Sequence, residues 1–366
     1  MAILTEHLNC IILAAGEGKR MHAPHSKVLC EVAGKPLLSW VLSAVRAAGI
    51  DAVCVVASSD DVKRAAAGCE IREQTKRLGT GHAVLCAMDF LKSNLGGHTL
   101  VLCGDAPFID EQTIAASCAQ HLEQDNALTV IAAEVADPSG YGRILRRGEN
   151  LLGIVEDADC DELQKEIREI NSGAYWFRTA DLLDALANLK NDNAQGEYYL
   201  PDTLSYLIGT GKNAGCYRAS NPNIVLGANR PIDLLTLNEI ASRMAIGRHL
   251  AAGVRFIETS GVVIGPDVKI EPGATILPNC QLYGDTTIGE GAVIGPNTVL
   301  TDTRIGAGTV VNASQCADSE VGAHATIGPF VQLRPNSVIG DKVKIGDFVE
   351  VKNSTIGAGT SLAHLT

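Results

Sequence analysis

The chain has 366 residues, of which 46% are hydrophobic and 20% are charged, and its formal net charge is −12 at pH 7. This length allows two domains, and the composition is that of a folded protein rather than a disordered one. The negative charge argues against a nucleic-acid partner, since proteins that bind the phosphate backbone usually carry a surplus of basic residues. A local cationic pocket for a small anion remains compatible with it.

The cysteine pattern and the start of the chain bear on location. Eleven cysteines are scattered along the sequence without a Cys-x-x-Cys pair. The first apolar run is interrupted by Glu6 and His7 and is soon followed by charged residues. It therefore fits neither a secretory signal nor a membrane span. We expect free thiols in a reducing cytoplasm and no membrane association.

A glycine-rich loop follows the first predicted strand. The apolar run Cys10–Leu13 is typical of a central parallel strand, and the loop after it contains Gly16 and Gly18. Glycines lack a Cβ, so backbone N–H groups there can approach a phosphate or a base edge. Arg20 can bind phosphate oxygens through a planar fork, and Lys27 adds a compact positive charge. This combination favours a nucleoside triphosphate site over an ordinary strand-to-helix turn.

The loop spacing excludes two commoner phosphate motifs. A P-loop needs a hydroxyl residue directly after its lysine, but Arg20 follows Lys19. A dinucleotide fingerprint needs a third glycine where Met21 stands. The segment from Leu13 to Lys27 instead resembles the signature of sugar-nucleotide pyrophosphorylases, Leu-x-x-Gly-x-Gly-Thr-x-Met with a later Pro-Lys. Lys19 replaces the Thr and Ser26 replaces the Pro, and neither change removes a charge.

The rest of the first half alternates predicted helices and strands. The segment 35–49 places four apolar residues on one helical face, with Gly49 as the stop, and the segments 53–57 and 100–103 indicate further buried strands. Those four residues are Leu38, Val41, Leu42 and Val45. Such alternation implies a doubly wound parallel sheet with ligand loops at the carboxyl ends of its strands. Asp105 follows one of these strands, where a carboxylate can hold Mg²⁺ beside phosphates or, alternatively, cap a helix.

The second half has a different architecture. The segment 231–250 predicts one connecting helix, begun by Pro231. From Ile264 to Leu362 an aliphatic residue returns mostly at six-residue steps, with five-residue steps to Ile305 and Ile356 and an interruption between Val311 and Val321, and glycine often follows it. A helix cannot keep this period, whereas a parallel β-helix of about five coils can. We therefore predict domains at 1–229 and 253–366, joined by a helix at 230–252. The repeat alone fits an acyltransferase or a trimerisation scaffold equally well.

The whole chain resembles the bacterial bifunctional N-acetylglucosamine-1-phosphate uridyltransferase and glucosamine-1-phosphate acetyltransferase family. The resemblance rests on several longer motifs. In the first half these are Gln74 with 78–83 (Leu-Gly-Thr-Gly-His-Ala), Gly104-Asp105, 140–144 (Gly-Tyr-Gly-Arg-Ile), 153–156 (Gly-Ile-Val-Glu), 169–173 (Glu-Ile-Asn-Ser-Gly) and 194–199 (Ala-Gln-Gly-Glu-Tyr-Tyr). In the second half they are 327–330 (Ile-Gly-Pro-Phe), 333–335 (Leu-Arg-Pro), 348–352 (Phe-Val-Glu-Val-Lys) and 364–366 (His-Leu-Thr).

The resemblance implies a Rossmann-like nucleotidyltransferase domain with a doubly wound mixed sheet and a left-handed parallel β-helix. It implies uridylyl transfer from UTP to N-acetylglucosamine-1-phosphate with Mg²⁺, giving pyrophosphate and UDP-N-acetylglucosamine for cell-wall precursors. Arg20, Lys27 and Asp105 would stabilise the phosphates, and Asp105 with Asn229 would hold the metal. The nucleotide would contact Leu13, Ala14, Ala15, Gly16, Lys27, Gln74, Gly79, Thr80 and Gly104. The sugar would contact Gly140, Glu156, Asn171 and Tyr199.

Three positions depart from the family pattern near the expected substrates. Cys103 stands where a Tyr commonly precedes Gly-Asp, Leu226 replaces a Glu before Asn229, and Pro201 replaces a Thr after the Tyr pair. Cys103 lacks a phenol and Pro201 a hydroxyl. The exact sugar is therefore less firmly indicated than the reaction.

For the second activity the resemblance implies His364 as the base of acetyl transfer from acetyl-CoA to glucosamine-1-phosphate, with Arg334 and Lys352 binding the sugar phosphate. The sequence stops at Thr366, where the family continues with further coils and a tail. We therefore expect weak or absent acetyl transfer. The β-helix is also expected to form a homotrimer.

Two rival functions remain open from the sequence. One is a nucleotidyltransferase for another sugar-1-phosphate, making an ADP-, GDP- or dTDP-sugar, because the glycine-rich loop is shared across that superfamily. The other is a non-catalytic regulatory subunit whose first half only senses a sugar nucleotide. Assays with four triphosphates separate the first rival, and an Asp105→Asn variant separates the second.

Overall fold

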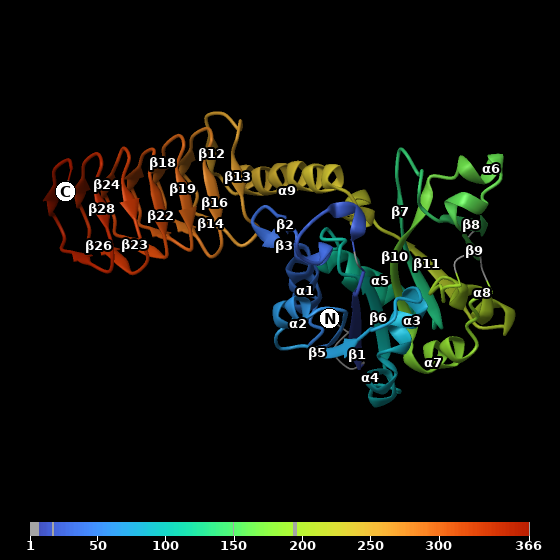
Figure 1. Ribbon diagram of the computed structural model, residues 1–366. Coiled ribbons are helices and arrows are strands. Elements are labelled where there is room, and N and C mark those ends of the chain that lie inside the picture. Colours follow the sequence, from blue (N-terminus) through green and yellow to red (C-terminus); the bar gives the residue numbers. More distant parts are fainter. Residues whose placement is uncertain (1–6, 17, 149, 193–195, 366) are drawn as a thin grey trace. The chain divides into compact units, whose positions relative to one another are not determined.

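The computed structural model describes residues 7–16, 18–148, 150–192 and 196–365 (Figure 1). The chain divides into two compact units. Unit 1 runs to Cys30 and continues from Pro36 to Leu234, and unit 2 joins Glu31–Lys35 to the chain from Leu235 onward. No helix within the described ranges is long and apolar enough to cross a membrane.

Unit 1 is built around a mixed sheet. Its main strands follow the order β11 (Ala214–Arg218), β7 (Leu128–Glu134), β10 (Glu169–Arg178), β6 (His98–Cys103), β1 (Leu8–Ala14), β4 (Ala52–Ala57) and β5 (Glu70–Glu73). The pairs β1–β4, β1–β6 and β4–β5 are parallel, whereas β10 is antiparallel to both β6 and β7. A hairpin of β8 (Arg143–Arg147) and β9 (Asn150–Val155) joins β10 at its start. The predicted strands 10–13, 53–57 and 100–103 are confirmed as β1, β4 and β6. The sheet is mixed, as the family resemblance implies, and not purely parallel, as the alternation of strands and helices alone would predict.

Helices connect the strands of unit 1. They are α1 (Leu37–Ala47), α2 (Asp60–Ala65), α3 (Thr80–Leu85), α4 (Met88–Ser93), α5 (Glu111–Glu123), α6 (Glu162–Lys165), α7 (Thr179–Ala187) and α8 (Asp202–Gly209). Short 3₁₀ turns add η2 (Lys19–Met21), η3 (Lys27–Leu29), η4 (Asp157–Asp159) and η5 (Pro222–Val225).

Helix α1 shows how local sequence and packing agree. It begins at Leu37 rather than at Lys35, because β2 (Glu31–Val32) and β3 (Lys35–Pro36) pair in a small two-stranded sheet. Gly49 ends the helix with φ of 79°, and its N–H and that of Ile50 bond back to Arg46 and Val45. This is the glycine-terminated helix end that the sequence predicted.

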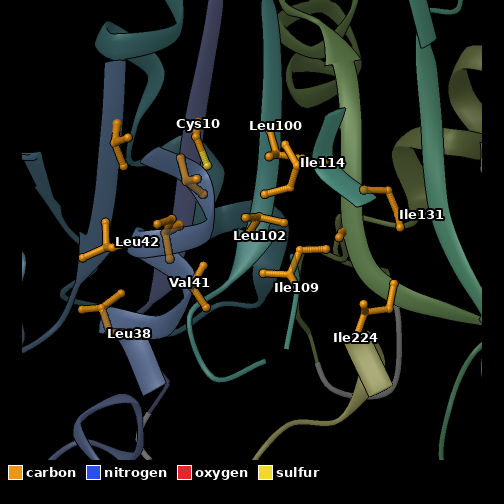
Figure 2. Packing of buried hydrophobic residues seen from close by; sticks show 14 of the residues in the cluster. Cys10, Leu38, Val41, Leu42, Leu100, Leu102, Ile109, Ile114, Ile131 and Ile224 are labelled. Carbon is orange, nitrogen blue, oxygen red and sulfur yellow. The ribbon is translucent and has the colours of Figure 1, made fainter. Parts of the chain in front are cut away.

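The apolar face of α1 packs on one side of the sheet (Figure 2). Leu38, Val41 and Leu42 belong to one buried cluster with side chains from β1 and β6, including Cys10 and Leu100. A second apolar cluster of unit 1 includes Ile11, Val101 and Tyr175, the neighbours in sequence of residues on the first face. The sheet is thus buried on both sides, which explains why its strands are continuous apolar runs.

Unit 2 contains most of α9 (Pro231–Ala251), the predicted single helix, and a parallel β-helix. One sheet stacks β12 (Arg255–Phe256), β15 (Thr275–Ile276), β18 (Val293–Ile294), β21 (Val310–Val311), β24 (Thr326–Ile327), β27 (Lys344–Ile345) and β30 (Ser361–Leu362). The second stacks β13 (Val263–Ile264), β16 (Gln281–Tyr283), β19 (Val299–Thr301), β22 (Gln315–Ala317), β25 (Gln332–Leu333) and β28 (Glu350–Val351). The third stacks β14 (Lys269–Ile270), β17 (Thr287–Ile288), β20 (Arg304–Ile305), β23 (Ser319–Val321), β26 (Ser337–Ile339) and β29 (Thr355–Ile356).

The aliphatic repeat forms the core of this β-helix. Ile264, Leu282 and Leu300 pair in register on one sheet, and the same column continues through Cys316 to Leu333. The aliphatic repeat is interrupted between Val311 and Val321, and Cys316 fills the missing core position there as a buried thiol. The predicted hexapeptide β-helix is confirmed, and in the hexapeptide families it is left-handed.

Candidate active site

Two adjoining cavities lie in unit 1 at the carboxyl ends of β1 and β6. The smaller cavity has a volume of about 310 Å³ and the larger about 560 Å³. The smaller is lined by Leu13, Ala15, Gly16, Lys27, Val28, Gln74, Arg77, Gly79, Thr80, Ala83, Cys103, Asp105, Glu197 and Tyr199. The larger is lined by Leu13, Thr80, Cys103, Gly140, Glu156, Asp157, Ala158, Asp159, Asn171, Gly173, Tyr175, Tyr199, Leu200 and Pro201. Leu13, Thr80, Cys103 and Tyr199 line both, so the two cavities form one cleft.

Lys27 occupies the polar centre of the smaller cavity. Its ammonium donates to the carboxylate of Asp105 in a close ion pair and to Asn229 Oδ1 at 3.1 Å. The side chains of Lys27 and Asp105 are only 17% and 15% exposed, so their charges are less screened than those of a surface pair. Three residues far apart in the sequence therefore meet at one point.

Two glycines of the predicted loop pack directly on Lys27. Gly18 has φ of 61°, and a Cβ there would lie 2.7 Å from the Cβ of Lys27. A Cβ at Gly16 would lie 3.3 Å from Lys27 Cε. The glycines thus fix the path of the lysine stem as well as leaving backbone accessible, which is more than the sequence argument required of them.

A buried amide forms the far wall of the smaller cavity. Gln74 is buried, and its Nε2 lies 3.1 Å from the carbonyl oxygen of Gly79 and 3.0 Å from His82 Nδ1. Thr80 Oγ1 accepts a hydrogen bond of 3.0 Å from the backbone N–H of Leu200. With Nε2 engaged in this way, Gln74 Oε1 can accept a hydrogen bond from a ligand.

A bulge in β10 shapes the larger cavity. The register of β10 against β7 shifts between Asn171 and Ala174, and Gly173 within the bulge has φ of 77°. Asn171 Nδ2 donates to the hydroxyl of Tyr175 at 2.7 Å, and its Oδ1 accepts from the backbone of Gly173 at 3.0 Å. The bulge thus turns an amide and a phenol toward the cavity from a strand that is otherwise buried.

The larger cavity is acidic. Burial raises the pKa of Glu156, and the neighbouring carboxylates Asp159, Asp202 and Asp157 raise it further. Asp157 is paired with Arg143 at 2.7 Å, and that guanidinium is almost fully buried. Carboxylates at such a density suit a neutral ligand rich in hydroxyl donors rather than a second anion.

The donor set at Lys27 fits a divalent metal. Asp105 offers a carboxylate and Asn229 an amide oxygen, and both already face one cationic atom, Lys27 Nζ. Hard oxygen donors of this kind suit Mg²⁺, which usually takes its remaining ligands from water and substrate phosphates. No cluster of three or more His, Cys, Asp or Glu side chains in the described part of the chain could form a self-sufficient metal cage.

The structure brings most of the predicted residues to this cleft. Leu13, Ala15, Gly16, Lys27, Gln74, Gly79, Thr80, Asp105, Gly140, Glu156, Asn171 and Tyr199 line it. Ala14 and Gly104 are buried just behind it, with the N–H of Gly104 bonded to Leu13. Arg20 lies on η2 with an exposed side chain and lines neither cavity. Ala194 and Gln195 of the predicted motif fall outside the described residues.

Sequence reasoning missed several residues of the cleft. Arg77 lines the smaller cavity and donates from Nε to the carbonyl oxygen of Ala15 at 3.0 Å. Tyr175 lies within an apolar strand, and no motif or turn residue beside it in the sequence indicates a ligand contact. Cys103 and Pro201, noted only as departures, both line the larger cavity. Burial, with a further contribution from Asp105, raises the pKa of Cys103 to about 12, so this thiol stays protonated.

The residues expected for acetyl transfer lie in unit 2. Arg334 follows β25, pairs with Glu350 at 2.8 Å and borders a cavity of about 210 Å³. Lys352 follows β28 of the same sheet and is exposed. His364 follows β30, which belongs to a different sheet. One chain therefore places Arg334 and Lys352 after neighbouring strands and His364 after another face of the β-helix.

Comparison with known protein families assigns both units. Residues 10–199 match the MobA-like NTP transferase domain, and residues 259–363 match the GMPPB C-terminal domain. Among solved structures, one named for glucose-1-phosphate thymidylyltransferase from Bacillus anthracis superimposes with a TM-score of 0.53 at 20% identity. That match covers 64% of this chain and 95% of the other, and it shows a shared fold.

Curated relatives match almost the entire chain. The bifunctional protein GlmU of Halalkalibacterium halodurans is 41% identical over 97% of this chain and 79% of its own length. GlmU of Acetivibrio thermocellus is 41% identical over 99% of this chain and 79% of its own length. GlmU of Clostridioides difficile is 39% identical over 98% of this chain and 79% of its own length. At this identity and coverage, the chain belongs to the family of the bifunctional protein GlmU.

Proposed function

We propose that the cleft of unit 1 transfers uridylyl from UTP to N-acetylglucosamine-1-phosphate, the nucleotidyltransferase reaction of UDP-N-acetylglucosamine synthesis that family membership assigns to the chain. The observation that carries the assignment of the site is the meeting of Lys27 with Asp105 and Asn229 at a glycine-lined cavity that adjoins an acidic one. The nucleotide would bind in the smaller cavity and the sugar in the larger. The phosphates of both would then meet near Lys27.

The reaction needs alignment and charge neutralisation more than a nucleophilic side chain. An oxygen of the sugar phosphate attacks the α-phosphorus of UTP, and the bond to the departing pyrophosphate breaks. Because both reactants are anions, Lys27 lowers their repulsion as they approach. Glu156 and Asn171 would hold sugar hydroxyls and the acetamide, while Gln74 would bond the uracil edge. Arg20, although outside the cavity lining, would reach the outer phosphates from its exposed position on η2.

Membership of the family indicates a divalent cation requirement, and we propose that the cation is Mg²⁺, held by Asp105 and Asn229. When bound it would neutralise charge on the phosphate oxygens. The ammonium of Lys27, released from these two oxygens, would then pair with a phosphate. Removal of divalent cations by EDTA should abolish pyrophosphate formation, and Mg²⁺ should restore it.

The decisive test is formation of pyrophosphate from UTP, N-acetylglucosamine-1-phosphate and Mg²⁺ by the purified chain. An Asp105→Asn variant should lose roughly 10²-fold or more in turnover, because it removes a charged ligand at the reacting phosphates. The matched control is Asp89→Asn, which changes an exposed carboxylate on α4 and should leave turnover unaltered. Thermal unfolding checks that both variants remain folded.

The same assay separates the rival functions. Faster product formation with ATP, GTP or dTTP than with UTP would assign a different sugar nucleotide. Tight binding of UDP-N-acetylglucosamine without turnover would indicate a sensing subunit. Because Cys103 and Pro201 line the larger cavity, the sugar should be varied as well, with glucose-1-phosphate as the first comparison.

Family membership also indicates acetyl transfer from acetyl-CoA to glucosamine-1-phosphate, and we place its sugar-phosphate contacts at Arg334 and Lys352 and its base at His364. Arg334 and Lys352 follow one sheet of the β-helix and His364 follows another, which supports a homotrimer in which copies of the chain complete each other's sites. Release of CoA thiol that depends on glucosamine-1-phosphate tests the activity, and light scattering tests the trimer. A cytoplasmic location agrees with these substrates and with the free thiols of the described cysteines.

A further inference from the structure

Two residues of the proposed phosphate and metal site, Lys27 and Asn229, lie shortly before points where the chain passes from unit 1 to unit 2. Lys27 lies a few residues before the unit boundary between Cys30 and Glu31. Asn229 lies a few residues before the boundary between Leu234 and Leu235. Each residue is therefore tied by a short covalent segment to a part of the chain that folds with unit 2.

The segment after Lys27 is held firmly within unit 2. Its backbone N–H at Ala33 donates to Asn238 Oδ1 at 2.9 Å. Lys35 Nζ donates to both carboxylate oxygens of Asp267, at 3.0 and 2.9 Å. Gly34 has φ of 76°, and a Cβ there would lie 2.5 Å from the ring of Tyr283. In Figure 1 the two strands β2 and β3 lie beside the first coil of the β-helix.

The segment after Asn229 is held by α9. The carboxylate of Asp233, in the first turn of this helix, accepts from the backbone N–H of Asn229 at 3.1 Å and of Arg230 at 2.8 Å. The backbone of Asn229 is thus tied to the first turn of α9. Asn238 lies further along the same helix.

These contacts close a circuit. From Lys27 the chain leads to Ala33, which bonds to Asn238, and α9 leads back from Asn238 to Asn229, which bonds to Lys27. Asn238, which lines neither cavity of the cleft, is therefore the side chain through which the hairpin and α9 are joined in this circuit.

We propose that Asn238 is a positioning residue for the uridylyl reaction. Through its hydrogen bond to Ala33, it sets the separation between Lys27, which precedes the β2–β3 hairpin, and Asn229, which precedes α9. The inference rests on the proposed function of the cleft. Without the hydrogen bond from Ala33 to Asn238, the β2–β3 hairpin shifts relative to α9, and Lys27 and Asn229 no longer keep the separation that metal binding needs. A displacement of about 1 Å at reacting groups can cost on the order of 10²-fold in rate.

Binding of Mn²⁺ in the presence of UTP, followed by electron paramagnetic resonance, tests this without turnover. Asn238→Leu, of similar size but without an acceptor, should weaken Mn²⁺ binding about tenfold, within the range expected for misplaced ligands. Asn238→Asp keeps an acceptor oxygen for the N–H of Ala33 and should bind as wild type. The control Glu239→Ala changes the exposed neighbour on the same helix.

Equal weakening in the Leu and Asp variants, or none in the Leu variant, would overturn the role of the bond. Lys35→Gln provides a second probe that leaves Asn238 in place, and it should weaken Mn²⁺ binding in the same direction by a smaller factor. Far-ultraviolet circular dichroism during heating checks that both units of each variant remain folded. If wild-type protein with UTP binds no Mn²⁺, the proposed cleft chemistry fails rather than the positioning role.

Discussion

At the scale of single residues, the cleft depends on how closely backbone approaches Lys27. Gly18 takes a left-handed conformation and leaves no room for a Cβ beside the lysine stem. A Gly18→Ala variant should therefore lose activity by roughly tenfold or more, because the ammonium shifts away from Asp105 and Asn229. It should also lose about 1 kcal/mol of stability from the strained φ. Steady-state rates and urea unfolding measure the two effects.

Gly148 offers a matched control for this variant. It has the same φ of 61°, yet a Cβ there meets nothing within 4 Å. Gly148→Ala should show the stability loss alone, with unchanged turnover. Equal effects on turnover in the two variants would mean that the contact with Lys27 is irrelevant.

Glu156 should make sugar binding sensitive to pH. Burial and then Asp159, Asp202 and Asp157 raise its pKa above the ordinary value for Glu of about 4.3. As pH falls through the raised pKa, the side chain becomes protonated and loses its capacity as a charged acceptor for sugar hydroxyls. The KM for the sugar phosphate should then rise, starting at a higher pH than for an ordinary Glu.

A Glu156→Gln variant isolates this effect from titration of the substrate phosphate. Its KM should be higher than that of wild type near neutral pH, and the ratio of the two should shrink as pH falls. Parallel KM curves over the whole range would assign the pH dependence to the substrate.

Much of the cleft could be predicted from the sequence because its parts are local. The glycine-rich loop and Asp105 each follow a recognisable strand, so the carboxyl edge of the sheet brings them together, and Lys27 was marked by its place in the motif that begins at this loop. Tyr175 and Arg77 could not be found in this way. Tyr175 enters the cavity only because a bulge at Gly173 interrupts an apolar strand, and Arg77 acts through a bond to the distant Ala15.

At the scale of secondary-structure elements, a buried polar network links α5 to the sheet. His121 on α5 is fully buried, with Nε2 at 3.0 Å from His98 Nδ1 and Nδ1 at 2.8 Å from Thr129 Oγ1. Its ring stacks on Trp176 at a centroid distance of 6.2 Å. Burial, aided by His98 and Arg178, lowers the pKa of His121 to about 3. The ring is therefore neutral in the folded protein at every pH of interest.

This network should make unit 1 less stable as pH falls. The unfolded chain takes up a proton at His121 near its ordinary pKa of about 6.5, whereas the folded chain does so only near 3. The stabilisation present above pH 6.5 is thus lost progressively below it, by up to about 1.4 kcal/mol per pH unit. Urea unfolding at pH 7.5, 6.5 and 5.5 should show the loss in wild type. The loss of stability should be smaller in the His121→Gln variant. An identical pH dependence of the unfolding free energy in both proteins would contradict the role given to His121.

The β-helix shows where sequence periodicity succeeds and where it fails. Six-residue steps placed Ile264, Leu282 and Leu300 in one column, because every third hexad returns to the same sheet. Around Cys316 the steps shorten to five and the column contains a thiol, so an aliphatic search passed over it. The segment Glu31–Lys35 carries no repeat at all, and only the bonds to Asn238 and Asp267 assign it to unit 2.

At the scale of the whole molecule, each unit has its own hydrophobic core, one on the mixed sheet and one inside the β-helix. Both tryptophans of the chain, Trp40 and Trp176, belong to unit 1. Tryptophan fluorescence therefore reports unfolding of unit 1, whereas far-ultraviolet circular dichroism reports both units. Two independent cores predict that these probes give different unfolding curves in urea.

The expected result is a fluorescence transition that moves to lower urea at pH 5.5, because His121 lies in unit 1, together with a second dichroism transition that moves less. If the β-helix forms a trimer, only the second transition should shift to higher urea as protein concentration rises, since association stabilises the unit that associates. Coincident curves at every pH and concentration would instead show that the hairpin held by Asn238 couples the two cores into one cooperative structure. The Asn238→Leu variant should then separate them.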